Sequence, residues 1–326
     1  MAPHVNPAPG VSDPVAVACA SNAAYALPLA VMLRSAVNQL EPMRELVAYI
    51  VDDGIDSADK MRVEDSLPER ASVHWLSPNR SGFDGLPLWG RMPITTYDKL
   101  TIADLVPPGV TRVIWLDCDM LILADLAGLW ESPMNGKHTL AVEDSLVPTV
   151  SSRFGVAGYE ELGLSADAPY FNAGVMMIDT ILWRRDEIAR RALKYLMEYG
   201  ARVFFWDQEA LNVALAGRWD GADPRWNWSA NLGRLSANPV NNDDGSAVLP
   251  WIVHFNGNLK PWQVPEDGPI NEQYFRTLDE TSWKGWRPAR TARAALLGWY
   301  GSSRLRRVVY PAEQWGIQIL RRFSQT

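Results

Sequence analysis

The chain has 326 residues, of which 47% are apolar and 21% charged, and its formal net charge is -7. This composition predicts a soluble globular protein of one large or two ordinary domains. The acidic balance argues against a nucleic-acid binder, which needs a basic face. The two cysteines, Cys19 and Cys118, lie in apolar segments and predict buried thiols in a reducing compartment rather than a disulfide framework.

The N-terminal segment, residues 1–13, is rich in proline and alanine, and we expect it to be disordered. It has no cationic stretch before the first apolar run, so we expect no secretory signal. The following residues 15–33 are interrupted by polar residues and Pro28, which makes a poor transmembrane span. A cytoplasmic location is therefore expected.

Apolar runs then alternate with helical patterns along the chain. The expected strands cover residues 15–20, 46–53, 72–76, 112–119, 140–144, 171–179 and 251–255. The expected helices cover residues 25–40, 57–70, 94–107, 180–200 and 207–217. Thr180 is the expected cap of the helix that Gly200 ends. This alternation predicts an α/β fold, a largely parallel sheet with helices on its faces.

Polar residues follow several strands at their carboxyl ends, where open parallel sheets bind ligands. They are Asp52, Asp53, Asp117, Asp119, Glu143, Asp144 and His254. In an extended segment Asp117 and Asp119 point the same way and Cys118 the other. Two such carboxylates need a cation between them, or one keeps its proton. Mn²⁺ or Mg²⁺ would suit them, with His254 as a third ligand of Mn²⁺; the alternative is a turn with solvated acids.

Three further segments carry polar residues in suggestive places. Gly257 and Lys260 share a loop that would suit a diphosphate, because glycine allows close backbone approach and lysine supplies charge. Asn172 and the small residues after it would let a polar ligand approach the backbone. Asp207 and Gln208 begin a helix, where Asp207 is equally explained as the N-cap. Each signal alone is also explained by a turn or a solvated side chain.

In combination and in order, LDCD, YFNAGVMMID, WDQEALN and HFNGNLKPW resemble glycosyltransferase family 8, which includes bacterial lipooligosaccharide galactosyl- and glucosyltransferases and glycogenin. The resemblance implies a GT-A fold, a Mn²⁺-dependent (or Mg²⁺-dependent) enzyme with a UDP-sugar donor, and transfer with retention of anomeric configuration. It implies a GT-A catalytic domain over residues 14–265 and a basic, aromatic C-terminal helical extension over residues 266–326.

By motif, the resemblance also assigns residues to each part of the donor. The residues implied for the metal and the diphosphate are Asp117, Asp119, His254, Gly257 and Lys260. The residues implied near the transferred sugar are Asn172, Ala173, Asp207, Gln208 and Asp144. Those implied for the nucleotide base are Asn22 and Tyr25.

Two residues depart from the family's usual pattern. Lys99 stands where the family usually places an arginine near the sugar and phosphate, so the charge is kept but the bidentate fork is lost. Asn22 stands where many members have an aspartate facing the base, and its carbonyl can still accept from uracil N3–H.

Retention requires either a covalent double displacement or attack from the face that the leaving group departs. The position matching a nucleophile holds Gln208, whose amide is a poor nucleophile. We therefore expect front-face attack, in which the leaving phosphate accepts the acceptor's proton. Gln208 would stabilise charge at the sugar, and Lys260 would assist the leaving diphosphate.

Residues 287–326 hold eight arginines and one acid, interleaved with aromatic residues. Such a segment suits an anionic membrane surface, as do the basic tails of family members that build lipid-linked glycans. This interpretation predicts a peripheral protein on the inner face of the cytoplasmic membrane, in lipopolysaccharide or other glycan biosynthesis. The alternatives are packing on the acidic body of the chain and a homodimer contact.

Two other functions fit parts of the sequence. A haloacid-dehalogenase-type phosphatase also has an Asp-x-Asp after an apolar strand, but position 121 is leucine instead of threonine or valine. A non-catalytic carbohydrate-binding protein would use some of the 15 tryptophans, including WNW at 226–228, as stacking platforms. For the glycosyltransferase, galactose or glucose is the expected sugar, and a saccharide or glycolipid the expected acceptor.

Overall fold

The computed structural model describes residues 13–88, 92–230, 240–241, 247–257, 260–264, 268–289 and 291. The predictions made for residues 1–12 and for residues 292–326 therefore lie outside the described residues.

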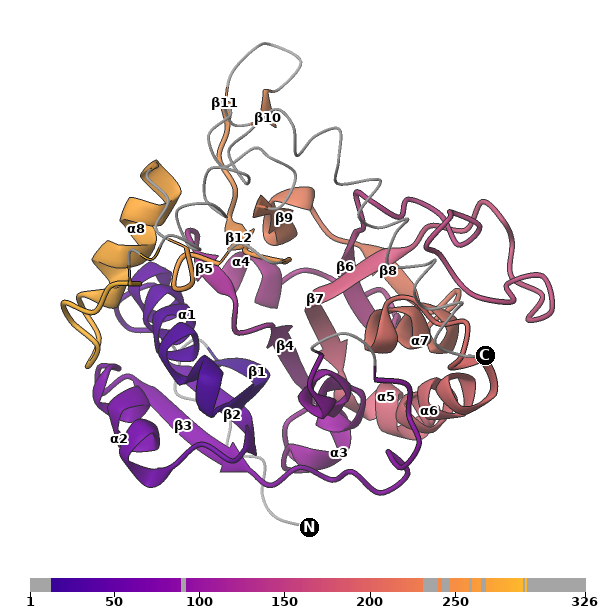
Figure 1. The fold of residues 1–326 in the computed structure, drawn as a ribbon, viewed down its shortest axis with the longest axis horizontal. Helices are drawn as coiled ribbons and strands as arrows, with labels where there is room; N and C mark the ends of the chain where they lie inside the picture. The colour runs from indigo at the N-terminus through magenta and orange to yellow at the C-terminus, as the bar shows by residue number, and fades with distance from the viewer. Residues whose placement is uncertain are drawn as a thin grey trace.

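A seven-stranded mixed sheet forms the centre of the molecule (Figure 1). Its strands are β1 (Val15–Asn22), β2 (Leu46–Asp53), β3 (Ala71–Leu76), β4 (Arg112–Leu116), β6 (Thr139–Glu143), β7 (Phe171–Asp179) and β8 (Trp219–Gly221). They lie in the order β3-β2-β1-β4-β7-β6-β8. All neighbouring pairs are parallel except those that β7 makes with β4 and β6. The apolar character of β1, β2 and β4 fits strands covered on both faces, and the expected α/β fold with a mostly parallel sheet is confirmed.

A smaller sheet stands above the carboxyl end of β4. It consists of β5 (Met120–Ile122), β12 (Ile252–His254) and β9 (Trp228–Ser229), with β12 in the middle, antiparallel to β5 and parallel to β9. A separate pair, β10 (Val240–Asn241) and β11 (Ala247–Val248), is antiparallel.

The strand predicted over residues 112–119 is confirmed as β4 but ends at Leu116, because residues 117–119 connect it to β5 of the small sheet. The backbone N–H of Asp117 still donates to Gly174 O of the central sheet at 3.0 Å. The carbonyl of Asp119 accepts from Phe255 N beside the small sheet at 2.8 Å. The two aspartates therefore occupy the connection between the sheets.

The α-helices are α1 (Ala26–Gln39), α2 (Ser57–Asp65), α3 (Ile102–Leu105), α4 (Ala127–Trp130), α5 (Thr180–Arg185), α6 (Ile188–Tyr199), α7 (Trp206–Ala214) and α8 (Pro269–Leu278). The 3-10 helices are η1 (Ala23–Tyr25), η2 (Ile94–Thr101) and η3 (Pro224–Asn227). The helix predicted over residues 94–107 is thus mainly the 3-10 helix η2. None of the helices in the described part of the chain is long and apolar enough to cross a membrane.

The helix predicted over residues 180–200 is broken in two. Glu187 has a φ of 51°, a left-handed conformation that interrupts the α-helix between α5 and α6. The cap of α5 is Asp179 and not the predicted Thr180. Asp179 Oδ1 accepts from the N–H groups of Ile181 and Leu182 at 2.9 and 2.8 Å.

Helices α1, α2 and α8 lie along one side of the molecule and α5, α6 and α7 along the other (Figure 1). Helix α8 belongs to the segment predicted as a C-terminal extension, and it packs against α1. Glu280, just beyond it, accepts from Arg34 and Asn38 of α1 at 3.1 and 2.8 Å. The α8 residue Tyr274 is fully buried, with its ring 5.6 Å from that of Phe255. This part of the extension supports the loop that follows β12.

Candidate active site

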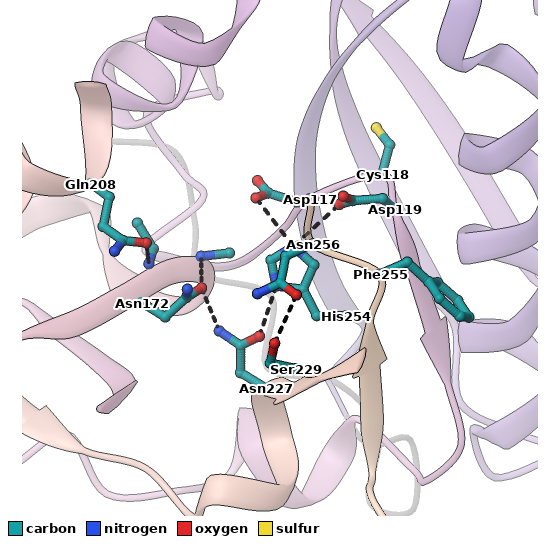
Figure 2. Close-up of polar contacts among 12 residues, drawn as sticks. Asp117, Cys118, Asp119, Asn172, Gln208, Asn227, Ser229, His254, Phe255 and Asn256 are labelled. Carbon is teal, nitrogen blue, oxygen red and sulfur yellow. Dashed lines mark hydrogen bonds and ion pairs between the residues drawn. The ribbon is translucent and has the colours of Figure 1, made fainter. Parts of the chain in front are cut away.

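Asp117, Asp119 and His254 converge where the two sheets meet (Figure 2). Each offers one ligand atom, and these atoms lie within 4.8 Å of one another. The Nε2 atom of His254 is 3.3 Å from Asp119 Oδ1 and 3.9 Å from Asp117 Oδ2. The pairing of β12 with β5, which sets His254 opposite Met120, brings the histidine to the aspartates.

The outer oxygen of each aspartate is held by donors of the chain. Asp117 Oδ1 accepts from Trp115 Nε1 at 2.9 Å and lies 3.2 Å from Lys99 Nζ. Asp119 Oδ2 accepts from Lys260 Nζ. Burial alone would raise the pKa of Asp119, but Lys260 and His254 lower it below its ordinary value.

The inner atoms, Asp117 Oδ2, Asp119 Oδ1 and His254 Nε2, therefore face one point with their lone pairs available. Two carboxylate oxygens and one imidazole nitrogen suit a divalent ion of the Mn²⁺ type. The second imidazole nitrogen and both outer oxygens already have partners, as is usual around metal ligands. These residues fit the metal that the sequence predicts.

Lys99 is 5% exposed and links this triad to the sugar side of the site. Its Nζ is 2.8 Å from Asp207 Oδ2, 3.2 Å from Asp117 Oδ1 and 3.3 Å from the carbonyl of Ala173. Burial alone would lower the pKa of Lys99, but the carboxylates of Asp117 and Asp207 raise it overall. Lys99 therefore stays charged between two acids.

Asp144 is the centre of the predicted sugar subsite. Its Oδ1 accepts from the backbone N–H groups of Leu146 and Val147 at 2.8 and 3.1 Å. Its Oδ2 accepts from Asn172 Nδ2 at 2.9 Å and from Gln208 Nε2 at 3.1 Å. Four donors hold this carboxylate in one orientation.

Asp207 and Gln208 lie in the first turn of α7. Gln208 Oε1 accepts from the backbone of Ala173 at 3.2 Å, and Asp207 Oδ1 accepts from Thr96 Oγ1 at 2.7 Å. The alternative that Asp207 is the N-cap of this helix is wrong, because Phe205 occupies that position. Both side chains are instead turned toward the site.

Glu209, which the sequence did not indicate, anchors the start of α7. Its fully buried carboxylate accepts from the backbone of Ala157 at 2.8 Å, the backbone of Phe204 at 2.7 Å and the hydroxyl of Tyr195 at 2.7 Å. These contacts precede Trp206, whose φ of 37° is unusual for a non-glycine residue. Glu209 thereby fixes the chain directly before Trp206 and the start of α7, which carries Asp207 and Gln208.

The predicted base and diphosphate residues lie at the ends of β1 and β12. Asn22 Oδ1 accepts from Ala24 N at 3.1 Å and caps η1, so the carbonyl offered to a base already has one partner. The ring of Tyr25 meets that of Trp262 edge to face at 5.8 Å. Lys260 also donates to the carbonyl of Phe255 at 2.6 Å, which fixes its loop beside the triad.

The predicted Gly257 begins this loop with a φ of 92°, a left-handed conformation that glycine adopts freely. Cys118 is free and buried, and its Sγ donates to the carbonyl of Ala20 at 3.2 Å, away from the triad, as predicted (Figure 2).

Two further residues of the site were missed in the sequence. Trp115 lies two residues before Asp117 in the apolar run, where it was counted only as part of a strand. Asn227 lies in WNW, where the sequence suggests a role only for the tryptophans, as stacking platforms. Trp226 of that motif is buried, with its ring 4.6 Å from that of Trp251, so it is a packing residue and not an open platform.

The mixed sheet, with two aspartates after its central strand and a histidine of the small sheet facing them, has the GT-A fold of solved glycosyltransferases. The galactosyltransferase LgtC, solved with donor and acceptor sugar analogs, shares this fold with a TM-score of 0.70; it is 23% identical, over 89% of this chain and all of that one. The profile of glycosyl transferase family 8 matches residues 16–264. The chain belongs to glycosyl transferase family 8.

Sequence relatives agree with this membership. General stress protein A of Bacillus subtilis is 29% identical over 82% of this chain and 93% of its own length. The lipopolysaccharide 1,3-galactosyltransferase of Salmonella typhimurium is 24% identical over 74% of this chain and 71% of its own length. The chain is therefore a glycosyltransferase, and neither the phosphatase nor the binding-only alternative fits.

Proposed function

We propose that this glycosyltransferase is a metal-dependent, retaining hexosyltransferase that moves galactose or glucose from a UDP-sugar to a saccharide or glycolipid acceptor. One observation carries the proposal: the ligand atoms of Asp117, Asp119 and His254 converge within 4.8 Å. The names of relatives, among them a lipopolysaccharide galactosyltransferase, support a role in lipopolysaccharide or other glycan biosynthesis.

Asp117, Asp119 and His254 would hold Mn²⁺ or Mg²⁺, which would supply positive charge to stabilise the leaving diphosphate. The chain supplies the remaining groups. Lys260 contacts Asp119 and is placed to bind the diphosphate as well, with Gly257 allowing its close approach. Asn22 and Tyr25 receive the uracil base at the end of β1.

The sugar is held by Asp144, Asn172, Gln208 and the backbone of Ala173, which are joined by hydrogen bonds of 2.9 to 3.2 Å. Hydroxyl groups of a hexose can pair with these fixed donors and acceptors. Because the amide of Gln208 is a poor nucleophile, we infer front-face attack. The bond from the anomeric carbon to the phosphate oxygen breaks, the acceptor oxygen bonds to that carbon, and the acceptor's proton passes to the leaving phosphate.

Asp207 and Lys99 act beside the sugar in this scheme. The Lys99 ammonium offsets the charges of Asp117 and Asp207, which leaves Asp207 available as a fixed acceptor. In the same way as Asp144, Asp207 has both oxygens engaged by donors of the chain. Neither carboxylate is free to form a glycosyl-enzyme without breaking these contacts, which supports the front-face route.

The test is a screen of nucleotide sugars with Mn²⁺, read as donor hydrolysis and as thermal stabilisation. UDP-galactose or UDP-glucose should be turned over, and Asp117→Asn and Asp119→Asn should lose this turnover while remaining folded. NMR of the glycosylated product should show the anomeric configuration of the donor. An inverted product, or full turnover in both variants, would overturn the proposal.

For the location of the enzyme, we propose a cytoplasmic protein that binds the inner face of the membrane through residues 287–326. The excess of arginine in that segment supports this proposal. Flotation with anionic vesicles should be lost in a chain that ends after Arg287. Arg287 itself is kept in this chain because it pairs with Asp279. Equal flotation of the two chains would favour tail packing on the body, and a change in oligomeric state would favour a homodimer contact.

A further inference from the structure

A line of hydrogen bonds joins the sugar side of the site to the histidine of the triad, and Figure 2 shows its part from Asn172 to His254. It runs from Asp144 to Asn172 at 2.9 Å, from Asn172 to Asn227 at 2.8 Å and from Asn227 to His254 at 2.9 Å. We propose that Asn227 is a positioning residue that keeps a proton on His254 Nδ1, so that Nε2 faces the aspartates as a ligand. This inference rests on the proposed metal site.

The direction of each hydrogen bond follows from the fixed groups at the start of the line. The backbone N–H of Gly174 can only donate, and it lies 3.0 Å from Asn172 Oδ1. This contact sets the Asn172 amide with its oxygen toward Gly174, so its Nδ2 group faces Asp144 Oδ2 at 2.9 Å.

This orientation passes on to the histidine. Because Asn172 presents an oxygen, Asn227 must present its Nδ2 group there and its Oδ1 to the imidazole. An amide oxygen can only accept, so His254 Nδ1 carries the proton whether or not the ring is charged. In the neutral ring Nε2 therefore has no proton and offers its lone pair to a metal, 3.3 Å from Asp119 Oδ1.

The backbone holds Asn227 firmly at this distance. Asn227 ends η3 directly before β9, and β9 pairs with β12 so that Trp228 lies opposite Val253. Asn227 is 8% exposed, and its Nδ2 and Oδ1 each have a partner in the chain. Metal-binding histidines usually donate their second N–H to such a partner, which fixes the tautomer and the orientation of the ring.

The same line connects the two halves of the site. Asp144 Oδ2 is shared between Asn172, which leads to the metal ligand, and Gln208, which is proposed to face the sugar. A change at the sugar side that disturbs Asn172 is therefore expected to reach His254 through Asn227.

The experiment measures Mn²⁺ binding alone, by calorimetry and by the electron paramagnetic resonance of free Mn²⁺, with no nucleotide sugar present. Asn227→Leu removes the acceptor and should weaken Mn²⁺ binding about 10- to 100-fold, as outer partners of metal ligands do. Asn227→Asp keeps an acceptor for Nδ1 and should bind Mn²⁺ within about threefold of the wild type. A purely structural role predicts the reverse order, because aspartate places a charge beside Asn172 Oδ1 and leucine does not.

A long-range ¹H–¹⁵N spectrum of the metal-free protein, at a pH where the imidazole is neutral, reads the tautomer directly. His254 should carry its proton on Nδ1 in the wild type and lose that preference in Asn227→Leu. Ser229→Ala is the matched control, because Ser229 lies two residues after Asn227 in the chain. The substitution removes its 2.7 Å hydrogen bond to Asn256 and should leave Mn²⁺ binding unchanged.

Wild-type Mn²⁺ binding in Asn227→Leu, with binding lost in Asp119→Asn, would overturn this inference and leave the proposed metal site intact. Wild-type binding in both variants would overturn the metal site as well.

Discussion

The ammonium of Lys99 lies 2.8 Å from Oδ2 of Asp207, and both side chains are almost completely buried. Because Lys99 also touches Asp117 at 3.2 Å, one buried cation is shared between a carboxylate of the triad and a carboxylate of the sugar side. The resemblance predicted a positive charge at this position but could not show that the charge is used within the chain. Lys99 and Lys260 together face the three carboxylates of Asp117, Asp119 and Asp207, so negative charge remains at the site for a cation.

Lys99→Met should leave Asp117 and Asp207 buried without this cation. Breaking a buried ion pair by removing one partner costs about 3 to 5 kcal/mol, so we expect a loss of that order in the free energy of unfolding, measured in chelator. Added Mn²⁺ should restore more stability to the variant than to the wild type, because it supplies charge beside Asp117. An unchanged denaturation midpoint in chelator would contradict the assigned role of Lys99.

Gly174→Ala should displace the histidine of the triad. A Cβ atom at Gly174 would lie 2.7 Å from Nδ1 of His254, closer still to its Cε1, and 3.0 Å from Asn172 Oδ1. Overpacking of this kind costs about 1 to 3 kcal/mol of stability, and Mn²⁺ affinity should fall roughly 10- to 100-fold as the ring moves. Calorimetric titration with Mn²⁺ measures the effect.

Gly221→Ala is the matched control for this substitution. Gly221 lies in β8 of the same sheet, and a Cβ there would meet no atom within 4 Å. This variant should bind Mn²⁺ as the wild type does. Equal losses in the two variants would mean that a methyl group in this sheet, and not contact with His254, causes the change.

Trp115→Phe should weaken the triad without removing a ligand. The substitution keeps an aromatic ring in the core but deletes the N–H that donates to Asp117 Oδ1 at 2.9 Å. We expect about 1 kcal/mol of lost stability and roughly tenfold weaker Mn²⁺ binding. Trp183→Phe deletes a comparable buried donor, to the carbonyl of Leu100 at 3.2 Å, and should cost stability alone. The same Mn²⁺ affinity in both variants would refute a role for Trp115 at the site.

The sequence predicted the central strands well because a strand buried on both faces is a continuous apolar run. Such a run is a local pattern that can be recognised without knowing the strand's neighbours. The prediction placed the end of the strand over residues 112–119 too late, because further apolar residues, Met120–Ile122, follow the two aspartates and hide the change from one sheet to the other. Such a change depends on pairing with β12, more than 100 residues away along the chain, which no local pattern encodes.

The candidate site divides in the same way. Asp117, Asp119 and His254 were named from motif order, and the structure brings them together. Asn227 was missed because its importance comes from the pairing of β9 with β12, which sets it against the histidine. Asn in WNW, flanked by residues that read as packing or stacking groups, has no signal of its own.

The start of the C-terminal extension offers a test of pH dependence. Asp279 accepts from Arg287 at 2.6 and 2.9 Å and from the backbone of Gly285 at 2.9 Å, and these contacts lower the pKa of Asp279 to about 2. A carboxyl group whose pKa is lowered by folding stabilises the folded state above its unfolded pKa, near 3.9, and loses that contribution as the pH falls toward 2. Because the pair is largely exposed, the contribution is expected to be small and to weaken in high salt.

Arg287→Ala should return the pKa of Asp279 toward its ordinary value, followed by the carboxyl carbon chemical shift in an NMR titration. The stability difference from the wild type should be present at neutral pH and vanish only as the pH falls through about 2, because Asp279 is protonated in both proteins below that pH. Arg276→Ala is the control, since Arg276 pairs with Glu272 on α8 at 3.7 Å and should leave Asp279 unchanged. If Asp279 titrated identically in all three proteins, Arg287 would not anchor this segment, and a chain shortened before Arg287 would serve the flotation experiment equally well.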